Sequence, residues 1–302
     1  MKTAEWQPII PGLFLVPGAN RGRFPHSHSF FVDGETTALI DVGCGPAVLE
    51  ALLRVQRLDL AIISHSHVDH CGGLWRLPGT PVISPEQHAD KFWRLEPLAD
   101  RFFGPGPLAD AWIQAVKMMV DARDAPAGSH YGDGHIFDFG RVRLQAIHAP
   151  GHLDDHYIFF EPRHGLVLLF DIDLTSFGPW YGNPESDIDL FLASIEKARA
   201  LRPALVASSH KGIVRDDIDQ HLRRFAQVFD RRDERLRELL RTARTIDELV
   251  DAGPIYGRET LGNPIVRLSE RRMIEKHLLR LERRGQVRRD GDCRYSRSGP
   301  AD

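Results

Sequence analysis

The chain has 302 residues, of which 42% are hydrophobic and 27% are charged, with a formal net charge of −3 at pH 7. These values exclude a disordered, collagen-like or disulfide-scaffold chain. No apolar run reaches the ~20 residues that a membrane helix needs, and the first residues lack the apolar core of a secretory signal. Because the three cysteines stand at unrelated spacings, we expect a cytoplasmic protein without membrane contact.

Short apolar runs separated by loops occupy the first two thirds of the chain and predict a layered α/β body. The expected strands are residues 13–16, 29–32, 37–41, 60–63, 136–147, 157–160, 166–170 and 203–207, and the expected helices are 46–57 and 187–201. Residues 86–122 are compatible with helix and are broken by the Gly-Pro-Gly-Pro run at 104–107. We expect them to form a helical insertion.

The pattern changes after residue 215. Apolar side chains recur at helical spacing within 217–243, and Thr245 with Glu248 forms a capping-box pattern. Ser269 is expected to cap a further helix that ends at Arg284, and a hairpin signal follows at 290–291. The chain therefore predicts two domains, residues 1–215 and a helical, winged-helix-like domain at 216–302.

The C-terminal part also holds the densest positive charge. Residues 271–297 carry ten basic and four acidic side chains. Such a stretch is typical of a nucleic-acid contact or of a solvated helix face, and we favour the solvated face. A homodimer contact and a cover for a functional site are two further roles for this module.

The segment that carries chemistry is SHSHVDHCGG at 64–73. His65, His67, Asp69 and His70 lie within six residues, directly after the expected strand 60–63. Imidazole and carboxylate bind borderline divalent metals without thiolate. In an extended turn, the side chains of His65 and His67 face one side, and those of Asp69 and His70 face a neighbouring position. This arrangement suits two metal ions.

Further candidates stand at the ends of later strands, and they are His148, His152, Asp171 and His210. Ligands at strand ends meet at one rim of a sheet. A single histidine is more often a solvated or core residue. The dense HxHxDH string, followed by several ligands at strand ends, favours a metal site.

These motifs resemble the metallo-β-lactamase superfamily over about residues 8–212. The likeness rests on HxHxDHxGG at 65–73, PGH at 150–152, and the strand-end residues Asp171 and His210. It implies an α/β fold, an αββα sandwich with a dinuclear metal site at one edge. By motif position, one ion would be held by His65, His67 and His152, the other by Asp69, His70 and His210, with Asp171 bridging both and His148 in a structural role.

The bridging acid could be Asp171 or Asp173. Asp171 is preferred because it follows the strand 166–170 directly and fits the spacing from the PGHxxDH pattern at 150–156. The family usually has glycine before this acid, whereas this chain has Phe170. The PGHxxDH pattern with a winged-helix-like end is also similar to a subgroup that includes a metal-dependent endoribonuclease.

The resemblance implies a metal-dependent hydrolase that uses a metal-bridging hydroxide. We expect two divalent ions, zinc first, with iron or manganese as alternatives. Asp171 would hold the ions, Asp69 would bind one ion and move a proton, and His156 would act as an acid or hydrogen-bond donor or orient a neighbour.

The expected substrate is a small-molecule ester, thioester or lactone. Trp180, Tyr181 and His26 are the predicted substrate contacts. The aromatic and methionine side chains of residues 86–122 either form an apolar lid or pack the insertion onto the sandwich, and packing is favoured. Two alternative functions are a ribonuclease that holds nucleic acid with its basic end and an iron-loaded redox protein.

Overall fold

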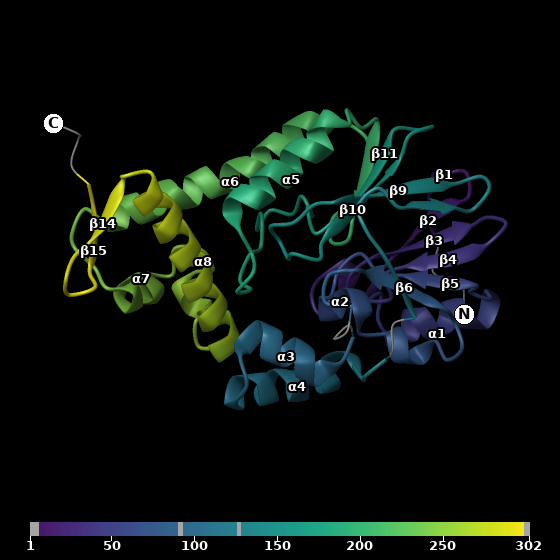
Figure 1. The fold of residues 1–302 in the computed structure, drawn as a ribbon, viewed down its shortest axis with the longest axis horizontal. Coiled ribbons are helices and arrows are strands. Elements are labelled where there is room, and N and C mark those ends of the chain that lie inside the picture. Colours follow the sequence, from purple (N-terminus) through teal and green to yellow (C-terminus); the bar gives the residue numbers. More distant parts are fainter. Residues whose placement is uncertain (1–5, 90–92, 126–127, 299–302) are drawn as a thin grey trace.

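The fold is a four-layer sandwich of two β-sheets between helices (Figure 1). The structure is a computed structural model, and it describes residues 6–89, 93–125 and 128–298. Within these ranges one sheet has seven strands in the order β1 to β7, and the other has six in the order β13-β12-β11-β10-β9-β8. The predicted αββα architecture is confirmed.

The first sheet is antiparallel from β1 to β4 and parallel from β4 to β7. Its strands are β1 Gln7–Ile10, β2 Leu13–Val16, β3 Ser29–Asp33, β4 Thr37–Ile40, β5 Leu60–Ile62, β6 Val82–Pro85 and β7 Ser129–Tyr131. In the second sheet only the β11–β12 pair is parallel among the described strands. Its strands are β8 Ile136–Asp138, β9 Arg143–His148, β10 Tyr157–Glu161, β11 Leu166–Phe170, β12 Leu205–Ser208 and β13 Gly212–Val214.

One strand contributes side chains to two apolar layers, one on each face of its sheet. In β11, Leu168 and Phe170 belong to the core between the sheets, whereas Val167 and Leu169 pack under the helices of the second sheet. Successive side chains of a strand point to opposite faces, so a strand that is apolar throughout is buried on both sides.

Each sheet is covered by its own helices. The apolar cluster on the first sheet includes side chains of α1 (Pro46–Val55), α3 (Leu95–Phe103) and α4 (Pro107–Val120). The cluster on the second sheet includes α5 (Ile188–Ala200) and the first half of α6 (Ile218–Leu239). Figure 1 shows α5 and α6 side by side over the second sheet.

The insertion expected at 86–122 contains α3 and α4, which are separated by a turn with φ 73° at Gly104 and φ 137° at Gly106. Trp93, Phe102 and Trp112 are buried in the core of the first sheet, as the packing interpretation expects. Of the other aromatic and methionine side chains of residues 86–122, Met118 and Met119 are exposed, and Phe92 lies outside the described residues.

The C-terminal part consists of the second half of α6, α7 (Ile246–Ala252), α8 (Pro264–Arg283) and the hairpin β14 (Val287–Arg289) and β15 (Tyr295–Arg297). The capping box of Thr245 and Glu248 is present at the start of α7. The prediction for Ser269 is wrong, because α8 begins five residues earlier, after Asn263. The Asn263 side chain accepts hydrogen bonds from Ile265 N and Val266 N, and Pro264 needs no such partner.

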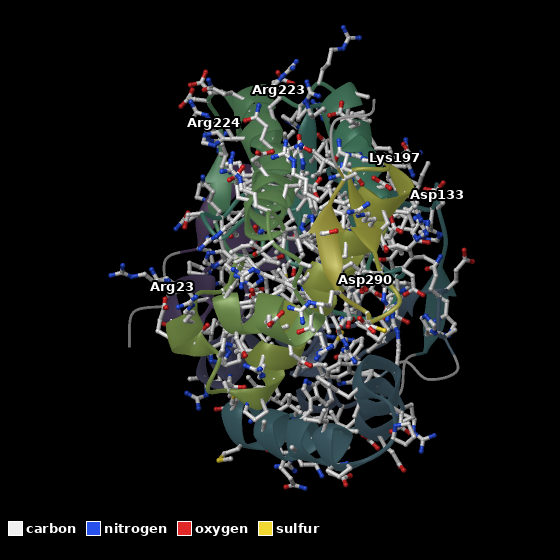
Figure 2. All side chains as sticks on the ribbon, turned by 90° about the vertical axis from the view of Figure 1, so that its left-hand side faces the viewer. Arg23, Asp133, Lys197, Arg223, Arg224 and Asp290 are labelled. Atoms are coloured by element: carbon white, nitrogen blue, oxygen red, sulfur yellow. The ribbon has the colours of Figure 1, made fainter. Side chains whose placement is uncertain are left out.

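Helix α6 connects the two parts of the chain. Phe225 and Phe229 pack on the second sheet, whereas Leu236 belongs to a separate apolar cluster with α7 and α8. Figure 2 shows Arg223 and Arg224 of this helix extending outward from the ribbon. The division at residue 215 falls between β13 and α6, and it stays a prediction. In the described residues, no helix combines the length and apolar character that crossing a membrane requires.

Replacing Phe170 by glycine is expected to destabilise the fold although it removes backbone strain. Phe170 has φ 48°, a left-handed conformation that costs about 1–2 kcal/mol for an L residue. Its buried ring packs edge-on against Phe30 at 5.7 Å and Phe159 at 5.1 Å between centroids. Losing such a ring costs about 3–5 kcal/mol, so we expect a net loss of about 2 kcal/mol.

Urea unfolding of the wild type, Phe170→Gly and Phe170→Ala checks this balance. The alanine variant keeps the strain and loses the ring, so it should be the least stable of the three. A glycine variant more stable than the wild type would show that strain outweighs packing at this position.

Candidate metal centre

The motif loop begins where β5 ends and continues into the short helix α2 (Val68–Cys71). His65 and His67 lie in the loop, whereas Asp69 and His70 lie on α2, and all but the half-buried His67 are buried. The loop after β4 passes very close to α2, since a Cβ built on Gly43 would lie 1.4 Å from the carbonyl oxygen of Asp69. Glycine at this position therefore lets the two segments meet.

The structure brings all seven predicted ligands into two adjacent groups. In each group, one potential ligand atom per residue lies within 4.8 Å of those of the others. The first group is His65, His67, His152 and Asp171, and the second group is Asp69, His70 and His210.

Asp171 faces both groups with its two oxygens. Oδ2 lies 3.2 Å from His152 Nε2 and 3.7 Å from His65 Nε2, which belong to the first group. Oδ1 lies 3.1 Å from His70 Nε2 and 3.5 Å from His210 Nε2, which belong to the second group. The carboxylate thus stands between the two groups.

Asp173, the other candidate for this position, has different partners. Its carboxylate accepts hydrogen bonds from the backbone N and the hydroxyl of Thr175, at 3.0 and 3.1 Å, and it belongs to neither group. Burial raises the pKa of Asp173 to about 6.

Hydrogen bonds on the outer side orient three of the ligand histidines. His152 Nδ1 lies 2.9 Å from the carbonyl oxygen of Trp180, and His210 Nδ1 lies 2.6 Å from that of Gly22. His70 Nδ1 lies 2.7 Å from the buried carboxylate of Asp41. Each acceptor favours a proton on Nδ1, so in each ring Nε2 is the nitrogen that faces the centre and would bind a metal ion.

The His67 ring is turned the other way, so that Nδ1 faces the first group and Nε2 faces away from it. Its Nδ1 lies 2.8 Å from His152 Nε2, inside the first group, and its Nε2 lies 2.8 Å from the side-chain amide of Asn183. The His67 ring therefore turns Nδ1 toward the first group, and Nδ2 of Asn183 contacts the ring at Nε2 on its other side.

The charges of the centre are strongly perturbed by burial and proximity. Burial lowers the pKa values of His65 and His67 well below the usual value, so both rings are neutral, as metal ligation requires. Burial alone would raise the pKa of Asp171, but His70 and His210 hold it well below its usual range. Burial alone would lower the pKa of His210, but Asp171, Asp69 and Asp173 together raise it to about 10, so this ring would release a proton when a metal ion binds.

The donor atoms fit metal ions. Among the described residues, His65 Nε2, His70 Nε2 and Asp171 Oδ1 are buried without a hydrogen bond of normal geometry, although the last two are 3.1 Å apart. Buried polar atoms without such partners are costly. A divalent ion in each group would satisfy them, and imidazole with carboxylate is a suitable donor set.

His156 has both ring nitrogens engaged. Its Nδ1 lies 2.9 Å from the carbonyl oxygen of Ala149, and its Nε2 accepts a hydrogen bond of 3.2 Å from the backbone N of Asp171. Burial lowers the pKa of His156 to about 3, so the ring is neutral at pH 7. This geometry matches the orienting alternative and leaves no proton for substrate.

The three predicted substrate contacts have different outcomes. Trp180 is half-buried beside the centre, with its ring 5.3 Å from that of His67. Tyr181 points the other way, is fully buried, and has its hydroxyl 2.6 Å from His277 Nε2 on α8. The expectation for Tyr181 is corrected, because a side chain enclosed by the C-terminal helices has no open face for a substrate.

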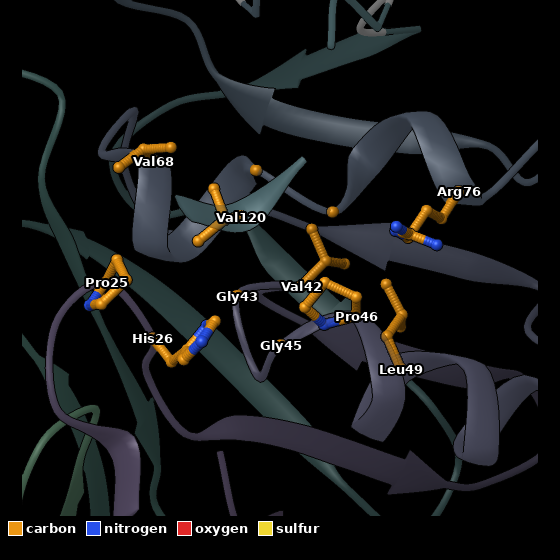
Figure 3. Close-up of a pocket in the computed structure, with 12 residues that line it drawn as sticks. Pro25, His26, Val42, Gly43, Gly45, Pro46, Leu49, Val68, Arg76 and Val120 are labelled. Carbon is orange, nitrogen blue, oxygen red and sulfur yellow. The ribbon is translucent and has the colours of Figure 1, made fainter. Parts of the chain in front are cut away.

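His26 lines a small cavity beside α2, together with Gly43, Gly45 and Val68 (Figure 3). The cavity volume is about 10 Å³, which holds about one water molecule. This space is far too small for an ester or thioester substrate. The predicted contact between His26 and substrate gains no support from it.

Sequence reasoning missed three side chains around the centre, which are Asp41, Asn183 and Arg101. Asp41 directly follows β4, and the same strand-end signal that pointed to Asp171 could have found it. Arg101 of α3 donates hydrogen bonds to Ser66 Oγ at 2.7 Å and to Asp155 at 3.2 Å, and it pairs with Glu185 at 2.9 Å. The insertion is thereby tied to the motif loop.

Comparison with known proteins identifies the class. The sequence model of the metallo-beta-lactamase superfamily matches residues 22–210. The chain therefore belongs to the metallo-β-lactamase superfamily, and the sequence-based resemblance is confirmed.

Named relatives of this chain include hydrolases. An atrochrysone carboxyl ACP thioesterase of Emericella nidulans is 22% identical over 299 residues, covering 95% of this chain and 86% of the relative. A hydroxyacylglutathione hydrolase of Aeromonas hydrophila is 26% identical over 134 residues, covering 44% of this chain and 41% of the relative. The expectation of a metal-dependent hydrolase is confirmed at the level of the superfamily.

Solved structures share the fold along almost the whole chain. A metallo-beta-lactamase family protein of Thermus thermophilus has a TM-score of 0.71 at 23% identity, covering 96% of this chain and 100% of that one. A beta-lactamase domain protein of Burkholderia ambifaria has a TM-score of 0.73 at 16% identity, covering 98% and 94%. These similarities extend to the C-terminal helices, and they establish the fold alone.

Proposed function

We propose that the chain is a dinuclear metal-dependent hydrolase. His65, His67 and His152 hold one ion, Asp69, His70 and His210 hold the other, and Asp171 binds both. The observation that carries this proposal is the placement of the two Asp171 oxygens, one toward each group. Zinc stays the predicted metal, with iron and manganese as alternatives, because these donors suit all three.

The two ions, when bound, supply a hydroxide at neutral pH and polarise the bond under attack. The protein groups contribute position and proton transfer. His156 holds the backbone at Asp171, and the buried acceptors behind the histidines fix the rings. Asp69 Oδ2 lies 3.4 Å from His210 Nε2, at the edge of the second group, where it can accept a proton.

The proposed substrate is a small-molecule ester, thioester or lactone. Hydrolysis of a thioester adds water across the acyl carbon–sulfur bond and gives a carboxylic acid and a thiol. Two relatives carry thioester-cleaving names, an acyl-carrier thioesterase and a hydroxyacylglutathione hydrolase. The half-buried ring of Trp180 lies 5.3 Å from that of His67 and provides apolar surface for an acyl group.

The ribonuclease alternative would use the basic side chains of residues 271–297. Three of these ten side chains are paired within the fold, Arg271 with Asp247, Arg280 with Asp233, and Arg294 with Glu248, so the stretch offers less free charge than its sequence suggests. A phosphate backbone is held by basic side chains that are free to displace counterions.

Metal content and substrate turnover test the proposal together. Protein purified without chelator is analysed for metal by plasma mass spectrometry and then assayed against thioesters, lactones and RNA. We expect about two divalent ions per chain and turnover of a thioester or lactone. Iron without hydrolysis of these substrates would overturn the proposal.

The Asp69→Ala variant is expected to lose the second ion and nearly all activity while it keeps its fold. Without Asp69, the second ion would keep only His70, His210 and the shared carboxylate of Asp171 as ligands among the described residues. Loss of the ion removes several kcal/mol of transition-state stabilisation, about 10³-fold in kcat/KM. Metal analysis, far-ultraviolet circular dichroism and the hydrolysis assay check this, and full activity with one ion would contradict the dinuclear scheme.

A further inference from the structure

The loop at residues 177–183 supports two histidines of the first group. The carbonyl oxygen of Trp180 lies 2.9 Å from His152 Nδ1, and the Asn183 amide lies 2.8 Å from His67 Nε2. Both contacts are on the side of the ring away from the centre. The path of this loop therefore determines the positions of these two rings and of the nitrogens that face the first group.

A single buried arginine of α6 holds this loop. Arg232 Nη1 donates to the carbonyl oxygen of Pro179 at 2.6 Å and to the hydroxyl of Tyr181 at 3.0 Å, and Nη2 donates to the carbonyl oxygen of Phe177 at 2.8 Å. The planar guanidinium offers several donors in one fixed fork, so it fixes three points of the loop at once. Lysine has no equivalent geometry.

A buried chain of hydrogen bonds fixes Tyr181 from the C-terminal helices. The Tyr181 hydroxyl lies 2.6 Å from His277 Nε2, and His277 Nδ1 lies 2.6 Å from the carboxylate of Asp233. That carboxylate also accepts a hydrogen bond of 2.5 Å from Arg280. The partners come from α6 and α8, so the C-terminal helices fix the loop through a connected network.

The same helices hold Trp180 by a second contact. Trp180 Nε1 donates a 2.5 Å hydrogen bond to the hydroxyl of Tyr256. The buried carboxylate of Glu270 on α8 accepts from the backbone N of Tyr256 at 2.8 Å and of Ile255 at 3.0 Å. Arg232 therefore binds the backbone of the loop, and Tyr256 binds the indole of Trp180 in that loop.

The second group has its own supports in the N-terminal part of the chain. Asp41 orients His70, and the carbonyl oxygen of Gly22 orients His210. Neither contact involves α6 or α8. Disturbing the C-terminal network should therefore affect one group and spare the other.

We propose that Arg232 is a positioning residue through which the C-terminal helices set the metal affinity of the first group. It acts by fixing loop 177–183, and through that loop the rings of His152 and His67. The inference rests on the proposed function for the identity of the two metal groups. It assigns the C-terminal helices a role in building the centre, distinct from nucleic-acid binding or dimerisation.

The test measures zinc affinity of each group separately by competition with a chromogenic chelator. Arg232→Met removes the donors and keeps most of the apolar stem. It is placed in an Asp69→Ala background to report on the first group, and in a His152→Ala background to report on the second. Arg231→Met, an exposed neighbour on the same helix, is the matched control.

We expect zinc binding to the first group to weaken about 10- to 100-fold, the usual effect of losing an orienting partner. The second group and the Arg231→Met control should keep wild-type affinity. Arg232→Lys keeps the charge without the fork and should show a smaller loss in the same group. If Arg232→Met does not fold, the zinc affinity of Arg232→Lys tests the proposal in its place.

Two results would overturn the inference. Wild-type zinc affinity in the first group of a folded Arg232 variant would show that the loop needs no such support. Equal weakening of both groups, with a lower melting temperature of the metal-free protein, would show a general loss of stability. Because the readout is metal binding, it is independent of the substrate, and failure of all hydrolysis assays would count against the proposed function alone.

Discussion

Asp171→Ala is expected to lose both metal ions and to lower kcat/KM by about 10³-fold or more. The two oxygens of this carboxylate lie 3.1–3.7 Å from four histidine nitrogens, two in each group. Its removal also takes away the negative charge that raises the pKa values of His70 and His210 and that would offset the charge of the bound cations. Metal stoichiometry and steady-state kinetics measure the two effects.

Asp173→Asn is the matched control for this experiment. Asp173 lies two residues away, is half-buried, and hydrogen-bonds with Thr175 outside the two groups. We expect the variant to keep two ions and most of its activity. If Asp173→Asn loses both ions while Asp171→Ala keeps them, the assignment of the bridging carboxylate is wrong.

Asp41→Asn is expected to weaken metal binding in the second group by about 10- to 100-fold and to reduce activity accordingly. Oδ2 of Asp41 accepts hydrogen bonds from His70 Nδ1 at 2.7 Å and from Ser64 Oγ at 2.8 Å. An amide nitrogen in this place would favour a proton on His70 Nε2. The lone pair needed by the metal would then be occupied.

Asparagine tolerates the φ of 58° found at position 41, so the substitution tests the hydrogen bond more than the backbone. The control is Asp33→Asn, at the exposed end of β3 in the same sheet. Zinc titration in the His152→Ala background isolates the second group. Unchanged affinity there would show that His70 is oriented without Asp41. Together with Arg232→Met, this variant should show that the two groups depend on separate parts of the chain.

The capping box at Thr245 is confirmed, and it needs only a partner three residues away. The motif at 65–70 likewise places four candidate ligands within six residues, and their role as metal ligands stays a prediction. The wrong start of α8 is also a local matter, because Asn263 followed by Pro264 is a stronger start signal than Ser269.

The predicted substrate contacts depended on the direction of a side chain. Trp180 and Tyr181 are neighbours in the sequence, yet the first borders the metal groups and the second is enclosed by α6 and α8. Successive side chains in an extended segment point to opposite sides. Which side faces the centre is decided by the elements that pack on each side.

The sequence by itself determined the superfamily, the chemistry of the candidate ligands and their approximate grouping, because spacing within a loop and position at strand ends are visible in one dimension. Only the tertiary structure decided how those ligands are held. Asp41 meets His70 across 29 residues, Asn183 meets His67 across 116, and Arg232 meets Pro179 across 53. Hydrogen bonds between such distant residues follow no periodic pattern along the chain, since they arise from the packing of separate elements.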